Sequence, residues 1–198
     1  MIVNHEHKFV FLHIPKTGGT SIATALSSRD RAQKVGRTKH HVVPELMPEG
    51  YFVFTFVRNP WDRMLSYYLF RHSEPRTGHR KTIHPDERRI GFSDWLKRLD
   101  EFSAWENINP AFHIAVSPQR NTVGDLPDFT GRFESMQADL EKVCTRLGID
   151  GVELTNVNKT STKKKHYASY FDDESVELIE KRFKPDIDHY GYNFERQL

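Results

Sequence analysis

The feature that most constrains this 198-residue chain is an apolar stretch that leads directly into a pair of glycines. Residues 8–14, Lys-Phe-Val-Phe-Leu-His-Ile, are apolar on both faces, which is typical of a buried parallel strand. Residues 15–21 follow as Pro-Lys-Thr-Gly-Gly-Thr-Ser, and residues 21–26 have the pattern of a helix opening. This order of strand, glycine loop and helix predicts an α/β protein with a ligand site at the carboxyl end of the strand.

The glycine loop, residues 15–21, combines the features of an anion-binding cradle. Gly18 and Gly19 let the backbone approach a ligand and turn its N–H groups toward it. Lys16 adds a full positive charge, and the following helix adds the positive end of its dipole. The loop also carries three hydroxyl donors, on Thr17, Thr20 and Ser21. The alternative is a tight turn with a solvated lysine.

The order of lysine and glycines excludes a Walker A loop. That motif ends in Gly-Lys-Ser/Thr, whereas Lys16 precedes both glycines of this chain. The magnesium-binding part of the Walker motif is therefore unsupported, and we expect no metal ion at this site.

A second motif begins where another apolar strand ends. Residues 51–57 are aromatic and β-branched throughout, which is typical of a strand. Asn59 is a good N-cap and Pro60 a good first helical residue, so a helix is predicted from Pro60 to about Arg71. Between strand and helix stands Arg58.

Arg58 is a candidate phosphate ligand, because a guanidinium can bind phosphate through two parallel hydrogen bonds. Ser66 lies eight residues further on, just over two helical turns, and adds a hydroxyl if the helix passes the same phosphate. The alternative is an ion pair between Arg58 and Asp62.

The remaining sequence continues the alternation of strands and helices. We expect a polar loop insertion at about residues 71–91 and a loop region at 107–128. The further predicted elements are a helix around Phe92–Leu99, a strand at 129–133, a helix over 135–147 that ends at Gly148, and a last helix that turns Val176, Ile179 and Phe183 inward. We therefore predict one domain over residues 1–198, with a three-layer, P-loop-like α/β fold whose central, mainly parallel sheet is flanked by helices.

Composition excludes several classes of protein. The net charge is +2, so no global field points to nucleic acid. The single cysteine, Cys144, excludes an internal disulfide framework and is read as a small core residue. The N-terminus does not resemble a signal peptide, and no apolar run reaches the roughly 20 residues of a membrane span. We therefore expect a cytoplasmic protein; the sequence leaves its oligomeric state open.

The two motifs together resemble those of the sulfotransferases that use 3′-phosphoadenosine 5′-phosphosulfate (PAPS). The first motif reads PKTGGTS and the second RNPWDRMLSYY. The closest branch is the carbohydrate O-sulfotransferases, and Gly-Arg-Phe-Glu at 131–134 and Asp-Ile-Asp-His-Tyr-Gly-Tyr at 186–192 are similar to the same family. The animal members carry an N-terminal membrane anchor, which this sequence lacks, so the resemblance implies a soluble, bacterial-type member.

The resemblance implies a role for each matching residue. Lys16 would neutralise the bridging oxygen as the sulfuryl group leaves, and the rest of the loop, Thr17, Gly18, Gly19, Thr20 and Ser21, would hold the 5′-phosphate. Arg58 and Ser66 would hold the 3′-phosphate of PAPS and of its product PAP. Lys159 and Thr160 resemble a late basic segment that closes over the nucleotide, although they also fit a solvated lysine run.

The acceptor, a hydroxyl group that we expect on a sugar or glycan, must lose its proton to a base. Related enzymes have a base histidine shortly before the second strand, which favours His41 over its neighbour His40. His113 and Glu45 are further candidates, whereas His13, inside the first strand, is read as a core histidine.

Two other functions remain open. A nucleotide kinase of the P-loop class shares the sheet and the anion loop, but it predicts magnesium-dependent ATP turnover. A non-catalytic module that binds PAP or sulfated glycans would bind the nucleotide without transferring sulfate.

Overall fold

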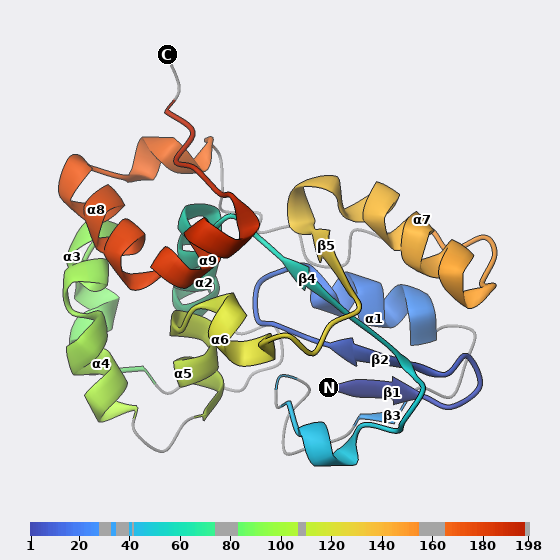
Figure 1. The fold of residues 1–198 in the computed structure, drawn as a ribbon. Coiled ribbons are helices and arrows are strands. Elements are labelled where there is room, and N and C mark those ends of the chain that lie inside the picture. The colour runs from blue at the N-terminus through green and yellow to red at the C-terminus, as the bar shows by residue number, and fades with distance from the viewer. Residues whose placement is uncertain are drawn as a thin grey trace. The chain divides into compact units, whose positions relative to one another are not determined.

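In the computed structural model of this protein, the most apolar stretches of the chain form three parallel strands. β2 (Phe9–Leu12) pairs with β4 (Phe52–Val57), and β4 pairs with β5 (Phe129–Arg132). Two antiparallel strands, β1 (Ile2–Asn4) and β3 (Gln33–Lys34), extend one edge, so that the order is β3-β1-β2-β4-β5 (Figure 1). The prediction of an α/β fold with a central, mainly parallel sheet is confirmed for this core of β2, β4 and β5.

The structure describes residues 1–27, 33–34, 40, 42–73, 83–106, 110–154 and 165–196. It divides the chain into two compact units, each made of two segments. The first unit comprises Met1–Arg58 and Gln119–Lys159, and the second comprises Asn59–Pro118 and Thr160–Leu198. The sheet therefore belongs wholly to the first unit.

The core of the first unit lies between one face of the sheet and two helices, α1 (Gly19–Ser27) and α7 (Met136–Leu147). Every second residue of β2 and β4 points to this face, which gives a layer of four buried rings, Phe9, Phe11, Phe54 and Phe56. Ile22 and Leu26 of α1 and Leu140, Val143 and Cys144 of α7 pack against them. Burial of one such side chain is worth about 1.5–3 kcal/mol, so this layer anchors the start of α1 next to the end of β2.

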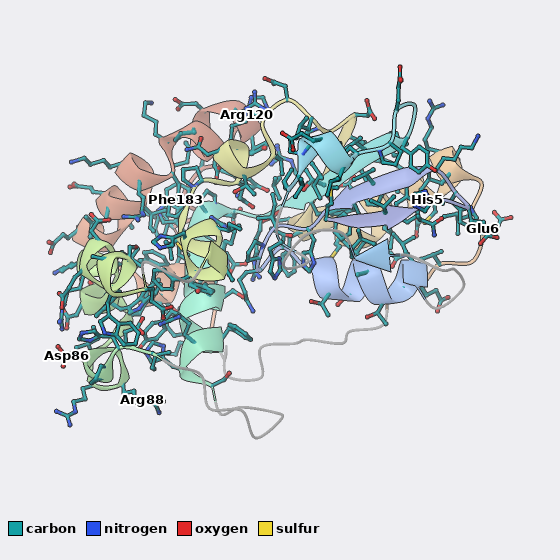
Figure 2. All side chains as sticks on the ribbon, turned by 90° about the horizontal axis from the view of Figure 1, so that it is seen from below. His5, Glu6, Asp86, Arg88, Arg120 and Phe183 are labelled. Atoms are coloured by element: carbon teal, nitrogen blue, oxygen red, sulfur yellow. The ribbon has the colours of Figure 1, made fainter. Side chains whose placement is uncertain are left out.

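Shorter elements complete the first unit. They are two 3₁₀ turns, η1 (Pro44–Leu46) and η3 (Phe133–Ser135), and the helix α6 (Gln119–Val123). Helix α7 ends as predicted at Gly148, whose φ of +65° is left-handed and whose N–H donates to the carbonyl of Thr145. Figure 2 shows His5 and Glu6 at the outer end of the turn between β1 and β2.

The second unit is helical. Its first helix, α2 (Pro60–His72), begins as predicted: the Asn59 side chain accepts hydrogen bonds from the N–H groups of Trp61 and Asp62. The other elements are η2 (Pro85–Arg89), α3 (Phe92–Lys97), α4 (Leu99–Trp105), α5 (Pro110–Val116), η4 (Tyr167–Tyr170), α8 (Asp173–Arg182) and α9 (Lys184–Tyr190). Phe183, between α8 and α9, is fully buried among these helices (Figure 2).

A buried ion cluster lies where the sequence suggested a solvated loop. Arg71 is 7% exposed and donates hydrogen bonds to both Glu87 and Glu106, while the Trp95 indole donates to Glu87 at 2.7 Å. Buried charges of this kind persist only when they are paired. The two ends of the expected 71–91 insertion are therefore packed; residues 74–82 between them lie outside the described residues.

Several elements differ from the predictions. The expected loop at 107–128 contains α5 and α6, and β1 was not anticipated. The last predicted helix is followed by a further helix, α9, which begins at Lys184 and has Pro185 in its first turn. Proline is tolerated at this position, because the N–H groups of the first helical turn have no partner within the helix. Among the described residues, no helix is both long and apolar enough to cross a membrane.

Candidate active site

The glycine loop has an unusual backbone, which its own hydrogen bonds hold in place. Lys16 has a φ of +69° and Gly18 a φ of +80°, so both lie in the left-handed region. The hydroxyl of buried Thr17 donates to the carbonyl of Ile14 at 3.0 Å, and the Ser21 N–H donates to the carbonyl of Gly18 at 2.9 Å. A left-handed backbone is uncommon for lysine and costs energy. Such a conformation at Lys16 is typical of a functional loop.

Both glycines are required by space. A side chain at Gly18 would collide with Met136 and Phe133, which come from the start of α7 and from η3. A side chain at Gly19 would collide with the ring of His13. The loop therefore passes close to its neighbours at the point where α1 begins, and only glycine fits at these two positions.

His13 is a core residue, as expected. It is 3% exposed, and its ring stacks on Phe11 with 5.5 Å between the centroids. The same ring fills the space beside Gly19, so His13 packs directly against the glycine loop.

Arg58, the first residue of the second motif, contacts the glycine loop. It follows the last residue of β4, is 7% exposed, and its Nη1 donates to the carbonyl of Lys16 at 3.0 Å. Its guanidinium lies over the Phe133 ring, 3.9 Å from the centroid. The structure therefore places two of the predicted phosphate ligands, Lys16 and Arg58, side by side within the first unit.

The main chain of Arg58 is held by a residue whose role the sequence did not reveal. The side-chain amide of Gln119 accepts from the Arg58 N–H and donates to the Arg58 carbonyl, both at 2.9 Å. Gln119 is fully buried at the start of α6. Its position, 61 residues after Arg58, follows from the fold and carries no local sequence signal.

His40 is held by the main chain of His13, the residue that packs against the glycine loop. Its Nδ1 lies 2.9 Å from the carbonyl oxygen of His13, and the two rings are 4.4 Å apart. A carbonyl oxygen can only accept, so Nδ1 carries the proton of this hydrogen bond and Nε2 of the neutral ring is the basic atom. His41 lies outside the described residues.

The other candidate bases have different surroundings. Glu45 is exposed on η1. His113 is half-buried on α5 in the second unit, where its carbonyl accepts from the Ser117 hydroxyl. The Ser117 hydrogen bond involves the main chain of His113 and therefore assigns no role to its imidazole.

The remaining predicted ligands are not brought to the loop by a described contact. Ser66 lies on α2 in the second unit and is 3% exposed. Lys159 and Thr160 lie outside the described residues. Their predicted roles stay predictions.

Perturbed titrating groups in the described part of the chain lie away from the glycine loop in sequence. Burial raises the pKa of Tyr67 to about 12. Burial also raises the pKa of the Cys144 thiol, in agreement with its expected core position. These shifts follow from packing of the two cores.

Only one group of described side chains has the spacing of a metal site. Ligand atoms of His84, Asp86 and Glu101 lie within 4.8 Å of one another in the second unit. Arg98 donates to both carboxylates, at 2.8 Å to Asp86 and 2.6 Å to Glu101, so a cation would have to compete with the arginine.

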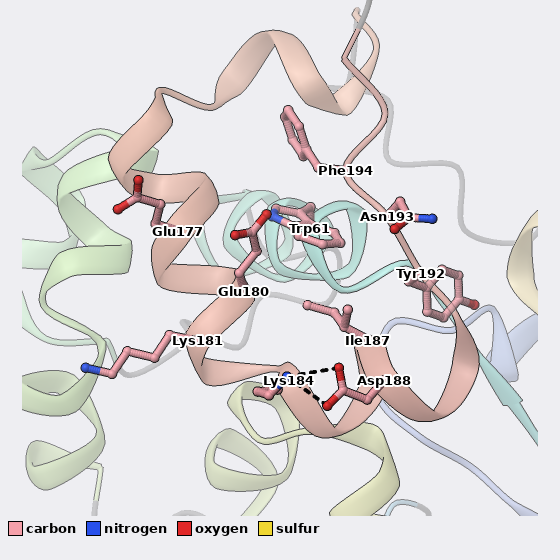
Figure 3. A pocket seen from close by; sticks show the side chains of 10 residues that line it. All are labelled: Trp61, Glu177, Glu180, Lys181, Lys184, Ile187, Asp188, Tyr192, Asn193 and Phe194. Atoms are coloured by element: carbon pink, nitrogen blue, oxygen red, sulfur yellow. Dashed lines mark hydrogen bonds and ion pairs between the residues drawn. The ribbon is translucent and has the colours of Figure 1, made fainter.

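The second unit also contains a surface pocket of about 440 Å³ (Figure 3). Its lining includes the apolar side chains of Trp61 and Ile187 and the ion pair between Lys184 and Asp188. None of its lining residues is a predicted site residue, and no feature of the pocket identifies a ligand.

Comparison with known proteins adds a family and a fold. A sequence model of the sulfotransferase family matches residues 1–193. An uncharacterized protein of Archaeoglobus fulgidus is 29% identical over 101 residues, which cover 51% of this chain and 71% of that protein. The crystal structure of the mouse sulfotransferase SULT7A1 complexed with PAP has a TM-score of 0.53, with 14% identity over 96% of this chain and 87% of that one. This likeness confirms the predicted P-loop-like fold.

Proposed function

The chain belongs to the sulfotransferase family, and we propose that it transfers a sulfuryl group from PAPS to a hydroxyl group of a carbohydrate. The observation that carries this proposal is the contact between the two motifs, in which the Arg58 guanidinium donates to the Lys16 carbonyl at 3.0 Å. The Arg58 guanidinium thus lies against the main chain of a left-handed glycine loop that leads into a helix N-terminus, which is an arrangement suited to a doubly phosphorylated nucleotide. The PAP bound by the mouse structure of the same fold supports this donor.

The glycine loop fits the 5′-phosphosulfate end of the donor. Gly18 and Gly19 let the loop pack closely against Met136, Phe133 and His13, which a larger residue would not allow, and the left-handed turn at Gly18 leads directly into α1. The first N–H groups of α1 and the hydroxyls of Thr20 and Ser21 donate to the 5′-phosphate. Thr17 contributes through its main chain, since its hydroxyl already donates to Ile14.

Lys16 stabilises the charge that moves during transfer. The acceptor oxygen forms a bond to sulfur while the bond from sulfur to the bridging phosphate oxygen breaks, and negative charge develops on that oxygen. The Lys16 ammonium neutralises this charge, which removes the need for a metal ion at the leaving group.

The other end of the donor is bound by the second motif. Arg58 grips the 3′-phosphate, and Ser66 adds a hydroxyl. Lys159 and Thr160 belong to the segment that closes over the nucleotide. The support for Arg58 is its orientation on Phe133 and Lys16; the support for the other three is the family resemblance.

The base is one of the two adjacent histidines. The family resemblance assigns the role to His41. The position of His40 supports the neighbouring residue as well, because its Nδ1 is held by the His13 carbonyl beside the glycine loop. The proton of the acceptor hydroxyl passes to the base histidine as the new sulfur–oxygen bond forms.

The role of Lys16 is tested by transfer of radiolabelled sulfate from PAPS to a panel of oligosaccharides and small alcohols. Loss of a charge aimed at the leaving oxygen is expected to lower the turnover of Lys16→Ala by about 10²–10³-fold, with PAP binding partly retained. Lys142→Ala, which removes a lysine side chain that is 65% exposed on α7, is the matched control. Wild-type PAP binding without transfer to any acceptor would make the protein a binding module, and magnesium-dependent ATP turnover would make it a kinase.

The base is identified by comparing His41→Ala with His40→Ala. Removal of a general base is expected to lower turnover by about 10²-fold or more without changing PAP affinity, and to abolish the fall in rate at acidic pH. We expect this result for His41→Ala, and a smaller loss for His40→Ala. The reverse order would assign the proton transfer to His40, and two near-normal rates would exclude both. His5→Ala, which removes an exposed histidine of the same unit, is the control.

A further inference from the structure

We propose that Gln119 is a positioning residue that fixes Arg58 for the 3′-phosphate, and so sets the preference of the site for nucleotides that carry this group. The inference rests on the proposed function, since it assumes that the guanidinium of Arg58 meets that phosphate. Gln119 stands outside both motifs, on the first turn of α6.

The side-chain amide of Gln119 binds the main chain of Arg58 in the way that a neighbouring β-strand would. In an antiparallel ladder, two facing residues exchange both an N–H and a carbonyl hydrogen bond. The Gln119 amide reproduces this exchange, with Oε1 accepting from the Arg58 N–H and Nε2 donating to the Arg58 carbonyl, each at 2.9 Å. β4 has ended at Val57 and its pairing with β5 ends there too, so Gln119 holds the first residue beyond the ladder.

This clamp determines where the guanidinium lies. The Arg58 side chain reaches Lys16 on one side, with 3.0 Å from Nη1 to the carbonyl oxygen, and covers the Phe133 ring at 3.9 Å. Both contacts leave little freedom once the main chain is fixed. A bidentate grip on phosphate requires the planar guanidinium in one orientation, so a shift of the Arg58 main chain is expected to weaken the grip.

The clamp also reaches the glycine loop through Arg58. The Lys16 carbonyl that accepts from Arg58 belongs to a residue in the left-handed region, with φ +69°. Gln119, Arg58 and Lys16 thus form a continuous series of hydrogen bonds from α6 to the loop. Loss of Gln119 is therefore expected to weaken the binding of the 3′-phosphate by Arg58 more than the binding of the 5′-phosphate by the glycine loop.

A purely structural role for Gln119 makes a different prediction. Buried main-chain groups need partners in any protein, and a residue that only supplied them would affect all nucleotides alike. The discriminating quantity is therefore the ratio of the dissociation constants of AMP and PAP. AMP carries the adenosine and the 5′-phosphate but lacks the 3′-phosphate.

The test measures both dissociation constants by calorimetry for the wild type, Gln119→Met and Gln137→Met. Methionine has a similar length and makes neither hydrogen bond, and Gln137 is an exposed glutamine on α7 of the same unit. We expect Gln119→Met to lower the wild-type preference for PAP over AMP by about tenfold, mainly through weaker PAP binding, and Gln137→Met to leave it unchanged. In an Arg58→Met background, where the grip is already absent, the substitution of Gln119 is expected to have no further effect on the ratio.

The possible outcomes separate this inference from the proposed function. A wild-type protein that binds PAP no more tightly than AMP would overturn the assignment of Arg58 to the 3′-phosphate. A wild-type preference that survives in Gln119→Met would overturn the role of Gln119 alone. If Gln119→Met does not fold, Gln119→Glu, which keeps an oxygen for the Arg58 N–H but loses the donor to its carbonyl, decides by the same ratio.

Discussion

At the scale of single residues, space is tightest at Gly19, where the His13 ring occupies the position that a β-carbon would take. Because His13 is held between Phe11 and the loop, the ring has little room to withdraw. Gly19→Ala is therefore expected to lower the free energy of unfolding by about 1–3 kcal/mol, as overpacking does elsewhere, and to weaken PAP binding. Chemical denaturation and calorimetry measure the two effects.

A double-mutant cycle shows whether the collision is the cause. In a His13→Ala background the ring is gone, so Gly19→Ala is expected to cost much less than in the wild type. Gly91→Ala is the control, because a β-carbon there meets no atom within 4 Å and the φ of −74° is ordinary. If Gly19→Ala lowered the free energy of unfolding equally in the wild type and in His13→Ala, the substitution would act through the backbone of α1 and not through the His13 ring.

Single residues differed in how far the sequence revealed them. The glycine loop was predictable, because a glycine pair directly after an apolar strand is a local signal, whereas the packing of Gly18 against Met136 and Phe133 was not. Gln119 acts on a main chain 61 residues away, and Arg71 is paired with Glu87 and Glu106, 16 and 35 residues away. An amide or a guanidinium gives no periodic signal, and its partner is known only once the chain has folded.

At the scale of elements, the start of α8 is capped by the side chain of Asp172, which does so as an ionised carboxylate. The Asp172 carboxylate accepts from the Ser175 N–H and from the Ser93 hydroxyl, both at 2.8 Å. The hydrogen bonds to Ser175, together with that from Ser93, lower the pKa of Asp172 to about 2. The folded state therefore favours the ionised carboxylate more than the unfolded state does.

This cap gives a pH-dependent prediction. Asp172→Ala is expected to lower the free energy of unfolding by about 1 kcal/mol at neutral pH, as loss of an N-cap does. Because the folded pKa lies below the unfolded value, the cap stabilises above about pH 4, and its contribution disappears as the pH falls toward 2. Denaturation curves measured between pH 7 and pH 2 should show that the difference in the free energy of unfolding between wild type and Asp172→Ala disappears as the pH falls.

The control for this cap is Asp188→Ala, which removes an exposed carboxylate that pairs with Lys184 on α9. It is expected to have a small effect throughout, because exposed ion pairs contribute little. If the difference in the free energy of unfolding between Asp172→Ala and the wild type stayed constant down to pH 2, the ionised carboxylate would not be the group that stabilises the start of α8.

Elements were predictable where their ends carry local signals. The Asn-Pro start of α2 and the glycine end of α7 were both confirmed. Helix α5 was missed because it has only seven residues, fewer than two turns of pattern. β1 was missed because a three-residue strand is defined by its neighbour, β2, more than by its own sequence.

At the scale of the whole molecule, the sequence predicted the class of fold and one edge of its sheet. The carboxyl ends of β2 and β4 were expected to carry the anion site, and the contact between Arg58 and Lys16 joins the residues that follow these strands. The division of each compact unit into two segments was not predictable, because it depends on long-range pairing rather than on any change in composition.

This division has a consequence for synthesis on the ribosome. β4 takes its second partner from the later segment of the first unit, with Phe54 opposite Phe129, so 75 residues must be translated before that partner exists. At a translation rate of about 5–20 residues per second, β4 therefore lacks this partner strand for roughly 4–15 s. During this interval the nascent chain carries an unpaired strand edge of the kind that recruits other strands, so slow translation of residues 58–128 is expected to increase aggregation of the newly made protein.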